Sequence, residues 1–183
     1  MQFSIRRAVP ADGPAISQVA AQTFALACPA NTPASEIHAY IQEHLKPADF
    51  ERLSQAPDKR LSVALLGDTI VGYSLVSHDP EPLGIAGADG VAELTKCYVL
   101  PDYHGTGVSQ SLVADVLGGV AGPLRLTVND TNSRAIAFYT RNGFAIVGET
   151  TFQCGADVHR DWVMLCRPLK HMDERQLDMT PLD

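Results

Sequence analysis

The stretch PDYHGTGVSQSL, residues 101–112, places two glycines one residue apart directly before a segment with apolar residues at helical spacing. Glycine destabilises a helix interior, and it is favoured where the backbone takes a positive φ or approaches another group closely. Residues 91–99 have strand character, so Gly105 and Gly107 lie between a strand and the start of a helix. The free N–H groups of a helix start attract anions. The stretch therefore predicts either a tight structural turn or a loop that binds a phosphate.

Two common phosphate-binding motifs do not match this loop. A P-loop requires Lys-Ser or Lys-Thr at its end, and this chain has Val108-Ser109 there. A dinucleotide-binding fingerprint requires a third glycine, where Gln110 stands, and it lies near the start of its domain rather than after several helices. Both motifs are excluded.

Residue patterns on both sides of the loop predict alternating strands and helices. Thr32 is expected to cap the second helix, Gly67-Asp68 to form a hairpin turn, and Gly143 to end the last helix. The order predicts an α/β or α+β fold, with a mixed sheet and helices on both of its faces. Strands are predicted at 3–8, 61–66, 69–76, 91–99, 124–128, 145–152 and 158–169, and helices at 12–26, 33–45, 48–55, 108–117 and 132–143.

Length and composition bound the class of protein. The chain has 183 residues, 45% of them hydrophobic, which predicts one domain over residues 1–170 and a polar tail over 171–183. A net charge of −7 argues against general nucleic-acid binding and favours cationic ligands. The start, MQFSIRRAVP, lacks a signal-peptide core and no stretch has membrane length, so a cytoplasmic protein without a membrane partner is expected. The four cysteines are scattered, and neither a disulfide framework nor a metal site is expected.

A second motif lies some 25 residues after the loop and narrows the interpretation. Residues 132–144, NSRAIAFYTRNGF, match the pattern Asn-x-x-Ala-x-x-Phe-Tyr-x-x-x-Gly-Phe. Together with His104-Gly105-Thr106-Gly107-Val108-Ser109, which follows Val99-Leu100-Pro101, this resembles the GNAT superfamily of N-acetyltransferases over essentially the whole chain. The loop departs from the family's Gln/Arg-x-x-Gly-x-Gly/Ala pattern at its first and last positions, where His104 and Ser109 stand.

The resemblance implies a splayed central sheet and acetyl-CoA as co-substrate. In the family the loop holds the pyrophosphate, and the end of the central strand, near Val99, pairs with the pantetheine arm. Asn132 resembles the residue that binds this arm, although an asparagine at a helix start also serves as an N-cap. The expected acetyl-CoA contacts are Cys97, Tyr98, Val99, His104, Gly105, Thr106, Gly107, Val108, Ser109, Asn132, Ala135 and Phe138.

Acetyl transfer to an amine requires a proton acceptor, because a free alkylamine has a pKa near ~10 and attacks only when neutral. Glu93 resembles the strand glutamate that serves as the base in some members, and under simple alternation it shares a strand face with Val99. A carboxylate at this place is equally consistent with pairing to Lys96. Tyr139 resembles the residue that protonates the departing thiolate. An acyl-enzyme on Cys97, activated by His104, is a less favoured alternative.

The chemical identity of the acceptor is the part of the function that the sequence constrains least. Residues 23–50 and 152–169 look similar to the bacterial spermine/spermidine acetyltransferase branch, which implies a polyamine or another small amine. The expected acceptor contacts are Phe24, Glu36, Tyr40 and Asp161. Two alternatives stay open, a peptide or protein N-terminal acetyltransferase and an acyl-CoA sensor without catalysis. A homodimer paired through the last strands is also expected.

Overall fold

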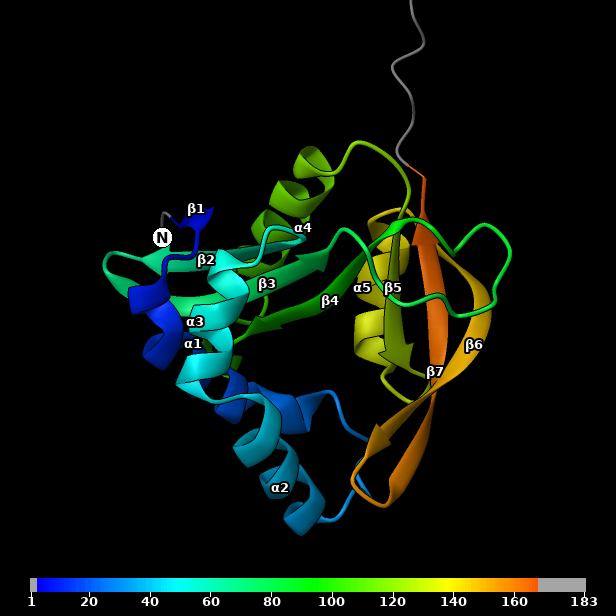
Figure 1. Cartoon of the computed structure of the whole chain (residues 1–183), viewed down its shortest axis with the longest axis horizontal. Helices are drawn as coiled ribbons and strands as arrows, with labels where there is room; N and C mark the ends of the chain where they lie inside the picture. Colours follow the sequence, from blue (N-terminus) through cyan, green and yellow to red (C-terminus); the bar gives the residue numbers. More distant parts are fainter. Residues whose placement is uncertain (1–2, 168–183) are drawn as a thin grey trace, which may run out of the picture.

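The computed structural model describes residues 3–167, and its centre is one seven-stranded sheet (Figure 1). The strand order is β1-β2-β3-β4-β5-β7-β6. The strands are β1 (Ser4–Arg7), β2 (Lys59–Leu66), β3 (Thr69–Ser77), β4 (Ala92–Val99), β5 (Leu124–Asn129), β6 (Phe144–Cys154) and β7 (Asp157–Cys166).

The sheet is mixed and splayed at its middle. All neighbouring strands are antiparallel except β4 and β5, which run parallel. These two pair only where they begin, Ala92 with Leu124 and Glu93 with Arg125, and then separate. The prediction of a mixed, splayed sheet is confirmed, and the separation leaves one edge of β4 unpaired from Leu94 onward.

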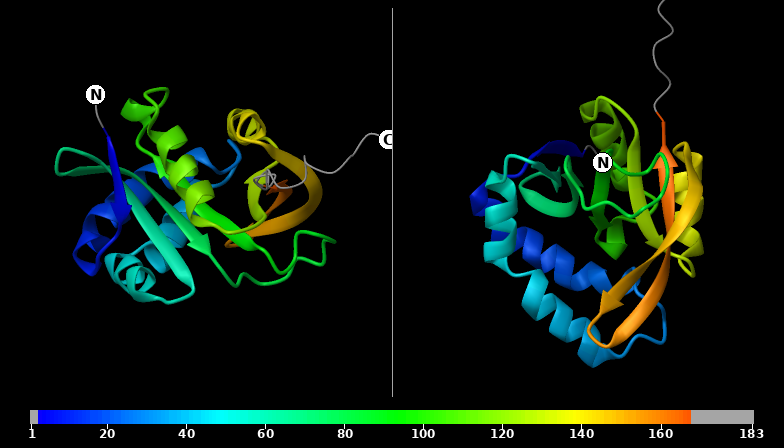
Figure 2. Two further views of the ribbon diagram at one scale, coloured as in Figure 1. Left: turned by 90° about the horizontal axis from the view of Figure 1, so that it is seen from above. Right: turned by 45° about the vertical axis from the view of Figure 1, so that its right-hand side comes forward.

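Helices cover both faces of the sheet, as predicted. Figure 2 shows α1 and α3 on one face of β1–β4 and α4 on the other, with α5 on the same side as α4 beside β5–β7. The helices are α1 (Gly13–Thr23), α2 (Ala34–His44), α3 (Pro47–Gln55), α4 (Val108–Gly119) and α5 (Ser133–Arg141), with short 3-10 turns at Pro10–Asp12, Phe24–Leu26 and Pro101–Tyr103.

The core is divided by the sheet into two main apolar layers. Ile16 and Phe50 belong to the layer under α1 and α3, where they pack with Tyr73 of β3. Leu112 and Val116 of α4 pack against the opposite face. Burial of apolar side chains stabilises each layer by roughly 25 cal/mol per Å² of apolar surface removed from water. The two layers hold β4 between them.

Two local predictions were wrong. Thr32 does not cap α2, because the N-cap is Pro33 and the Thr32 hydroxyl instead lies 3.3 Å from His159 Nε2. The last two strands are not both edges, because β7 lies between β5 and β6 and only β6 is at the border of the sheet. The tail predicted over 171–183 lies outside the described residues.

Among the described residues, no helix has both the length and the apolar character required to span a membrane.

Candidate functional site

The separation of β4 from β5 opens a cavity of about 480 Å³ that extends from the α4 start to the β6–β7 hairpin. It gathers most of the residues predicted for the site, from six separate parts of the chain. Those that line it are Phe24, Tyr40, Cys97, Tyr98, Val99, His104, Gly105, Gly107, Ser109, Asn132, Ala135, Phe138, Tyr139 and Asp161. The other four predicted residues, Glu93, Thr106, Val108 and Glu36, do not line it.

The glycine loop forms one end of the cavity and fits an anion. Gly105 and Gly107 have φ of 76° and 96°, and Gly107 is the N-cap of α4. A Cβ built on either glycine would meet no atom within 4 Å, and no side chain caps the helix. The start of α4 therefore has amides without a side-chain cap, at the positive end of the helix dipole, beside a loop with free space around its glycines. Thr106 instead bonds Tyr103 O, and Val108 is fully buried below the loop.

His104 has a defined structural role beside this loop. Its Nε2 donates to the Val99 carbonyl at 2.9 Å, and its Nδ1 accepts from Arg134 Nη1 at 2.7 Å. Because a carbonyl only accepts, Nε2 carries the proton and the ring is neutral. The histidine thus ties the end of β4 to α5. With both nitrogens engaged, it is not free to activate Cys97, whose thiol pKa burial raises to about 12.

Glu93 is not part of the cavity, and the reason is a bulge in β4. The pairing with β3 skips one residue, since Leu75 faces Lys96 and Val76 faces Leu94. The extra residue, Thr95, reverses the alternation of faces along the strand. Glu93 therefore shares its face with Lys96 and Tyr98 rather than with Val99, and the prediction from simple alternation was wrong.

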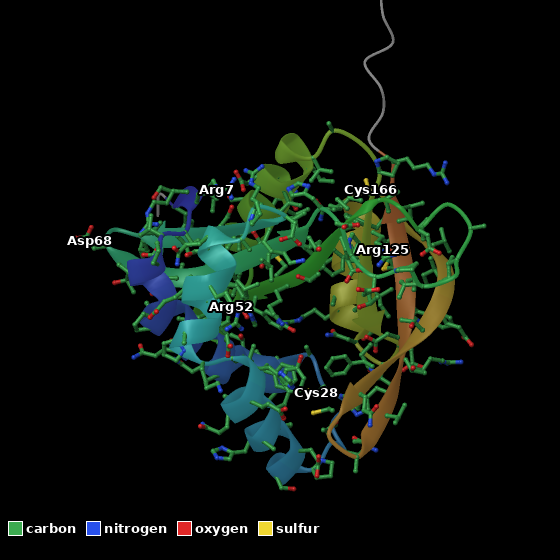
Figure 3. The ribbon with its side chains drawn as sticks, viewed as in Figure 1. Arg7, Cys28, Arg52, Asp68, Arg125 and Cys166 are labelled. Atoms are coloured by element: carbon green, nitrogen blue, oxygen red, sulfur yellow. The ribbon has the colours of Figure 1, made fainter. Side chains whose placement is uncertain are left out.

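The Glu93 carboxylate is held instead by a buried arginine at the closed end of the splay. Arg125 Nε donates to Glu93 Oε2 at 2.6 Å, and the arginine side chain is 1% exposed. The same guanidinium binds the carbonyls of Ala88 and Glu81 and the carboxylate of Asp89. Figure 3 labels Arg125 at this end of the sheet and Cys28 toward the open end. The alternative partner for Glu93, Lys96, is also not the one observed.

Tyr139 lies at the middle of the cavity with its hydroxyl near Cys97. Burial raises the pKa of Tyr139 well above its ordinary value, and the charges and hydrogen bond of neighbouring Cys97 and Tyr98 add to this. The phenol is therefore protonated at neutral pH. On the same helix, Asn132 Oδ1 accepts from Ala135 N at 3.1 Å and caps α5. Within the described residues its Nδ2 makes no hydrogen bond, so the N-cap role leaves a donor for a ligand.

The opposite end of the cavity has an aromatic wall and one carboxylate. The rings of Phe24 and Tyr40 stack with centroids 4.4 Å apart, and Phe152 meets Tyr40 edge-on at 5.6 Å. Asp161 is 8% exposed, and burial raises the pKa of its carboxyl although a hydrogen bond from Asn129 opposes this. An apolar wall beside a buried carboxylate suits an organic cation.

Glu36 lies outside this end of the cavity. Its carboxylate accepts from Ala156 N at 3.2 Å and occupies the space beside Gly155, where a Cβ would clash with it. The residue thus joins α2 to the β6–β7 hairpin. It does not line the cavity, because the strand pair folds back onto α2 and engages its carboxylate.

Several cavity residues had no signal in the sequence. His159 reads as a surface histidine, yet it is 7% exposed and bonds Asp157 at 2.6 Å. Lys96 reads as an ion-pair partner, yet it borders the cavity. The other residues not predicted are Thr23, Leu26, Ala27, Cys28, Leu94, Thr95, Gln110, Thr127, Val128, Asn129, Arg134, Arg141 and Phe152. Only tertiary pairing brings them together, so spacing along the chain could not identify them.

Comparison with known proteins identifies the fold and the family. The model of the acetyltransferase (GNAT) family matches residues 24–144. Two uncharacterized N-acetyltransferases, from Mycobacterium bovis and Mycobacterium tuberculosis, are each 38% identical over 158 residues, which is 84% of this chain and 96% of theirs.

Solved structures share the fold at lower identity. The PaiA N-acetyltransferase of Thermoplasma acidophilum, solved with coenzyme A, superposes with a TM-score of 0.72 at 19% identity, covering 91% of this chain and 99% of that one. The ribosomal-protein-S18-alanine N-acetyltransferase of Escherichia coli gives a TM-score of 0.63 at 17% identity, covering 91% and 94%. The chain therefore belongs to the acetyltransferase (GNAT) family and has the fold of an acetyl-CoA-dependent N-acetyltransferase.

Proposed function

We propose that this protein transfers the acetyl group of acetyl-CoA directly to the primary amine of a small molecule. The observation that carries the proposal is the position of Tyr139, a partly buried phenol with a raised pKa, in a cavity that runs from the glycine loop to a carboxylate-bearing aromatic chamber. A proton donor is needed at the point where the thiolate departs, and a phenol with a raised pKa supplies one at neutral pH.

The residues of the cavity suit each part of the co-substrate. The amides behind Gly105 and Gly107 would hold the pyrophosphate, and the unpaired edge of β4 would pair with the amide groups of pantetheine. Asn132 Nδ2 provides a further donor on α5. When bound, the thioester supplies the activated acetyl group.

In this proposal Asp161, and not Glu93, attracts the amine and accepts its proton. Among the described residues it is the carboxylate that borders the cavity. Ionised, it would attract the ammonium form of the acceptor and accept its proton, directly or through a water. Its raised pKa makes it a stronger base than an exposed aspartate.

The acceptor is a small amine in this proposal, and a polyamine is one candidate. A polyamine needs several carboxylates along its length, yet Glu36 is engaged by the hairpin backbone and Asp157 by His159. Asp161 remains, which supports an acceptor with one ammonium group near the chamber. A peptide N-terminus also satisfies this description.

The test is release of CoA, followed with a thiol reagent, when the protein and acetyl-CoA meet amino acids, short peptides, spermidine, spermine and aminoglycosides. Release that depends on the acceptor supports the enzyme and identifies its acceptor class. Tight binding of acetyl-CoA by calorimetry without release for any acceptor would contradict catalysis and favour a sensor.

A further inference from the structure

Lys96 is a cation in the cavity that lacks a partner in the protein. It follows the bulge in β4 and borders the cavity. Over residues 3–167, its side chain makes no hydrogen bond or ion pair, and burial lowers its pKa with no neighbouring charge to oppose this. A desolvated ammonium group without a counter-charge is costly in a folded protein. Such a group is consistent with a partner that arrives with the ligand.

The bulge sets which face of β4 carries Lys96. The register places it on the same face as Tyr98, two residues further along β4, which is about 7 Å in an extended strand. Tyr98 packs in the layer that holds Tyr40, and burial raises its pKa, with the charge of Asp161 as a smaller contribution. Lys96 and Asp161 therefore both border the cavity, with opposite charges and from different strands.

We propose that Lys96 binds a carboxylate of the acceptor, which makes the acceptor an amino acid or a short peptide. This inference rests on the proposed acetyltransfer and specifies its substrate class. Asp161 receives the ammonium group of a zwitterion, Lys96 receives its carboxylate, and the wall of Phe24, Tyr40 and Phe152 receives an apolar side chain. A polyamine would meet an uncompensated positive charge at Lys96, which disfavours it.

The first experiment compares acceptors that differ only in this charge. Phenylalanine, methionine and lysine are each assayed against the corresponding amide, with spermidine alongside. A carboxylate bound by a desolvated lysine predicts a kcat/KM for the acid at least about 30-fold above that for the amide. Equal rates for acid and amide, or faster turnover of spermidine, would overturn the inference and leave the acetyltransferase intact. No turnover with any acceptor would overturn the proposed function and, with it, this inference.

The second experiment changes the lysine. Lys96→Met should abolish the preference for the acid over the amide, and Lys96→Arg should largely retain it because the charge remains. The matched control is Lys46→Met, which changes an exposed lysine outside the cavity and should retain the preference. If Lys96→Arg is as inactive as Lys96→Met on acid and amide alike, Lys96 is a proton acceptor and not a carboxylate site.

A third measurement needs neither turnover nor acetyl-CoA. The melting temperature of the free protein should rise with phenylalanine and not with phenylalaninamide, and the rise should be absent in Lys96→Met. The carboxylate could also belong to the acyl chain of the donor, so succinyl-CoA is compared with acetyl-CoA. A drop in succinyl transfer in Lys96→Met, with the acid-to-amide preference unchanged, would overturn the assignment to the acceptor.

Discussion

The two ends of the gap between β4 and β5 differ in whether the protein pairs their charged groups. At the closed end, Arg125 is 1% exposed, and its guanidinium binds two carboxylates and two backbone carbonyls. At the open end, Lys96 and the Nδ2 of Asn132 have no partner within residues 3–167, and Asp161 is buried with a raised pKa. The closed end is saturated by the protein, whereas the open end retains free donors and charges.

This difference separates structural polar residues from those available to a ligand. A fully paired network rigidifies the point where the strands meet, and removing one member leaves a buried charge. Unpaired polar groups cost stability and persist where another molecule completes them. Glu93 is a partly buried carboxylate paired by Arg125, whereas Asp161 is a buried carboxylate that borders the cavity.

The largest expected effect comes from breaking the Glu93–Arg125 ion pair at the closed end. Glu93→Leu should lower the free energy of unfolding by about 3 kcal/mol, because it removes the closer of the two carboxylates that pair with the buried Arg125. Urea unfolding measures this, with Glu149→Leu on the exposed side of β6 as the control. The milder Glu93→Gln should retain kcat within about threefold in folded protein, and a loss of 100-fold or more would restore Glu93 as the base.

The second-largest expected effect is at the open end, and it changes the rate of catalysis alone. Tyr139→Phe removes the proton donor and should lower kcat by about 100-fold or more while acetyl-CoA binding stays the same. Stopped-flow or steady-state CoA release and calorimetry measure the two quantities. Tyr103→Phe, outside the cavity, is the control and should have wild-type kcat. Unchanged turnover in Tyr139→Phe would remove this residue from the acid role.

The third effect tests the loop. Gly107→Ala forces an alanine to a φ of 96° and should destabilise the protein by about 1–2 kcal/mol. Gly67→Ala has the same kind of strain in the β2–β3 hairpin, also in open space, and is the matched control. Only Gly107→Ala should also weaken acetyl-CoA binding, by about tenfold, since its Cβ would stand where the pyrophosphate approaches the amides. Equal affinities in both variants would mean that the loop is a structural turn.

The smallest effect concerns Asp161 and has a defined sign. Burial raises its pKa in the folded state above that in the unfolded chain, so the folded protein binds the proton more tightly. The free energy of unfolding therefore falls as pH rises from the unfolded pKa through the folded one. Asp161→Asn should remove this fall and stabilise the protein at pH 7 by up to about 1–2 kcal/mol, while turnover decreases.

Thermal melts from pH 4 to 8 measure this effect, with Asp68→Asn in the exposed hairpin turn as the control. A lower melting temperature for Asp161→Asn at pH 7 would contradict the assignment of an uncompensated carboxylate.

Most of the fold could be predicted because it depends on local patterns. The Gly67-Asp68 hairpin, the glycine loop before α4 and the Asn132 start of α5 each follow from residues within one turn. The capping of α2 could not be predicted, because Thr32 is drawn to His159, a residue 127 positions away. A long-range hydrogen bond in this case outweighed the local capping preference.

The site was predictable where a single element supplies the residues and not where several elements meet. The loop glycines and Tyr139 belong to motifs that can be recognised from residue spacing in the sequence, and these residues line the cavity. Glu93 was misplaced because one bulged residue, Thr95, reverses the faces of β4, and no composition signal marks that bulge. Glu36 was misplaced because its carboxylate turns to a hairpin backbone.

The sequence by itself determined the order of elements, the glycine loop before α4 and the place of Tyr139 on α5, because these depend on backbone propensity and fixed spacing. The tertiary structure alone decided which charges are satisfied. Arg125 pairs with Glu93 outside the cavity lining, and the splay leaves Lys96 and Asp161 facing a common cavity. Electrostatic pairing acts through space between strands far apart in the chain, so it becomes visible only once the sheet is assembled.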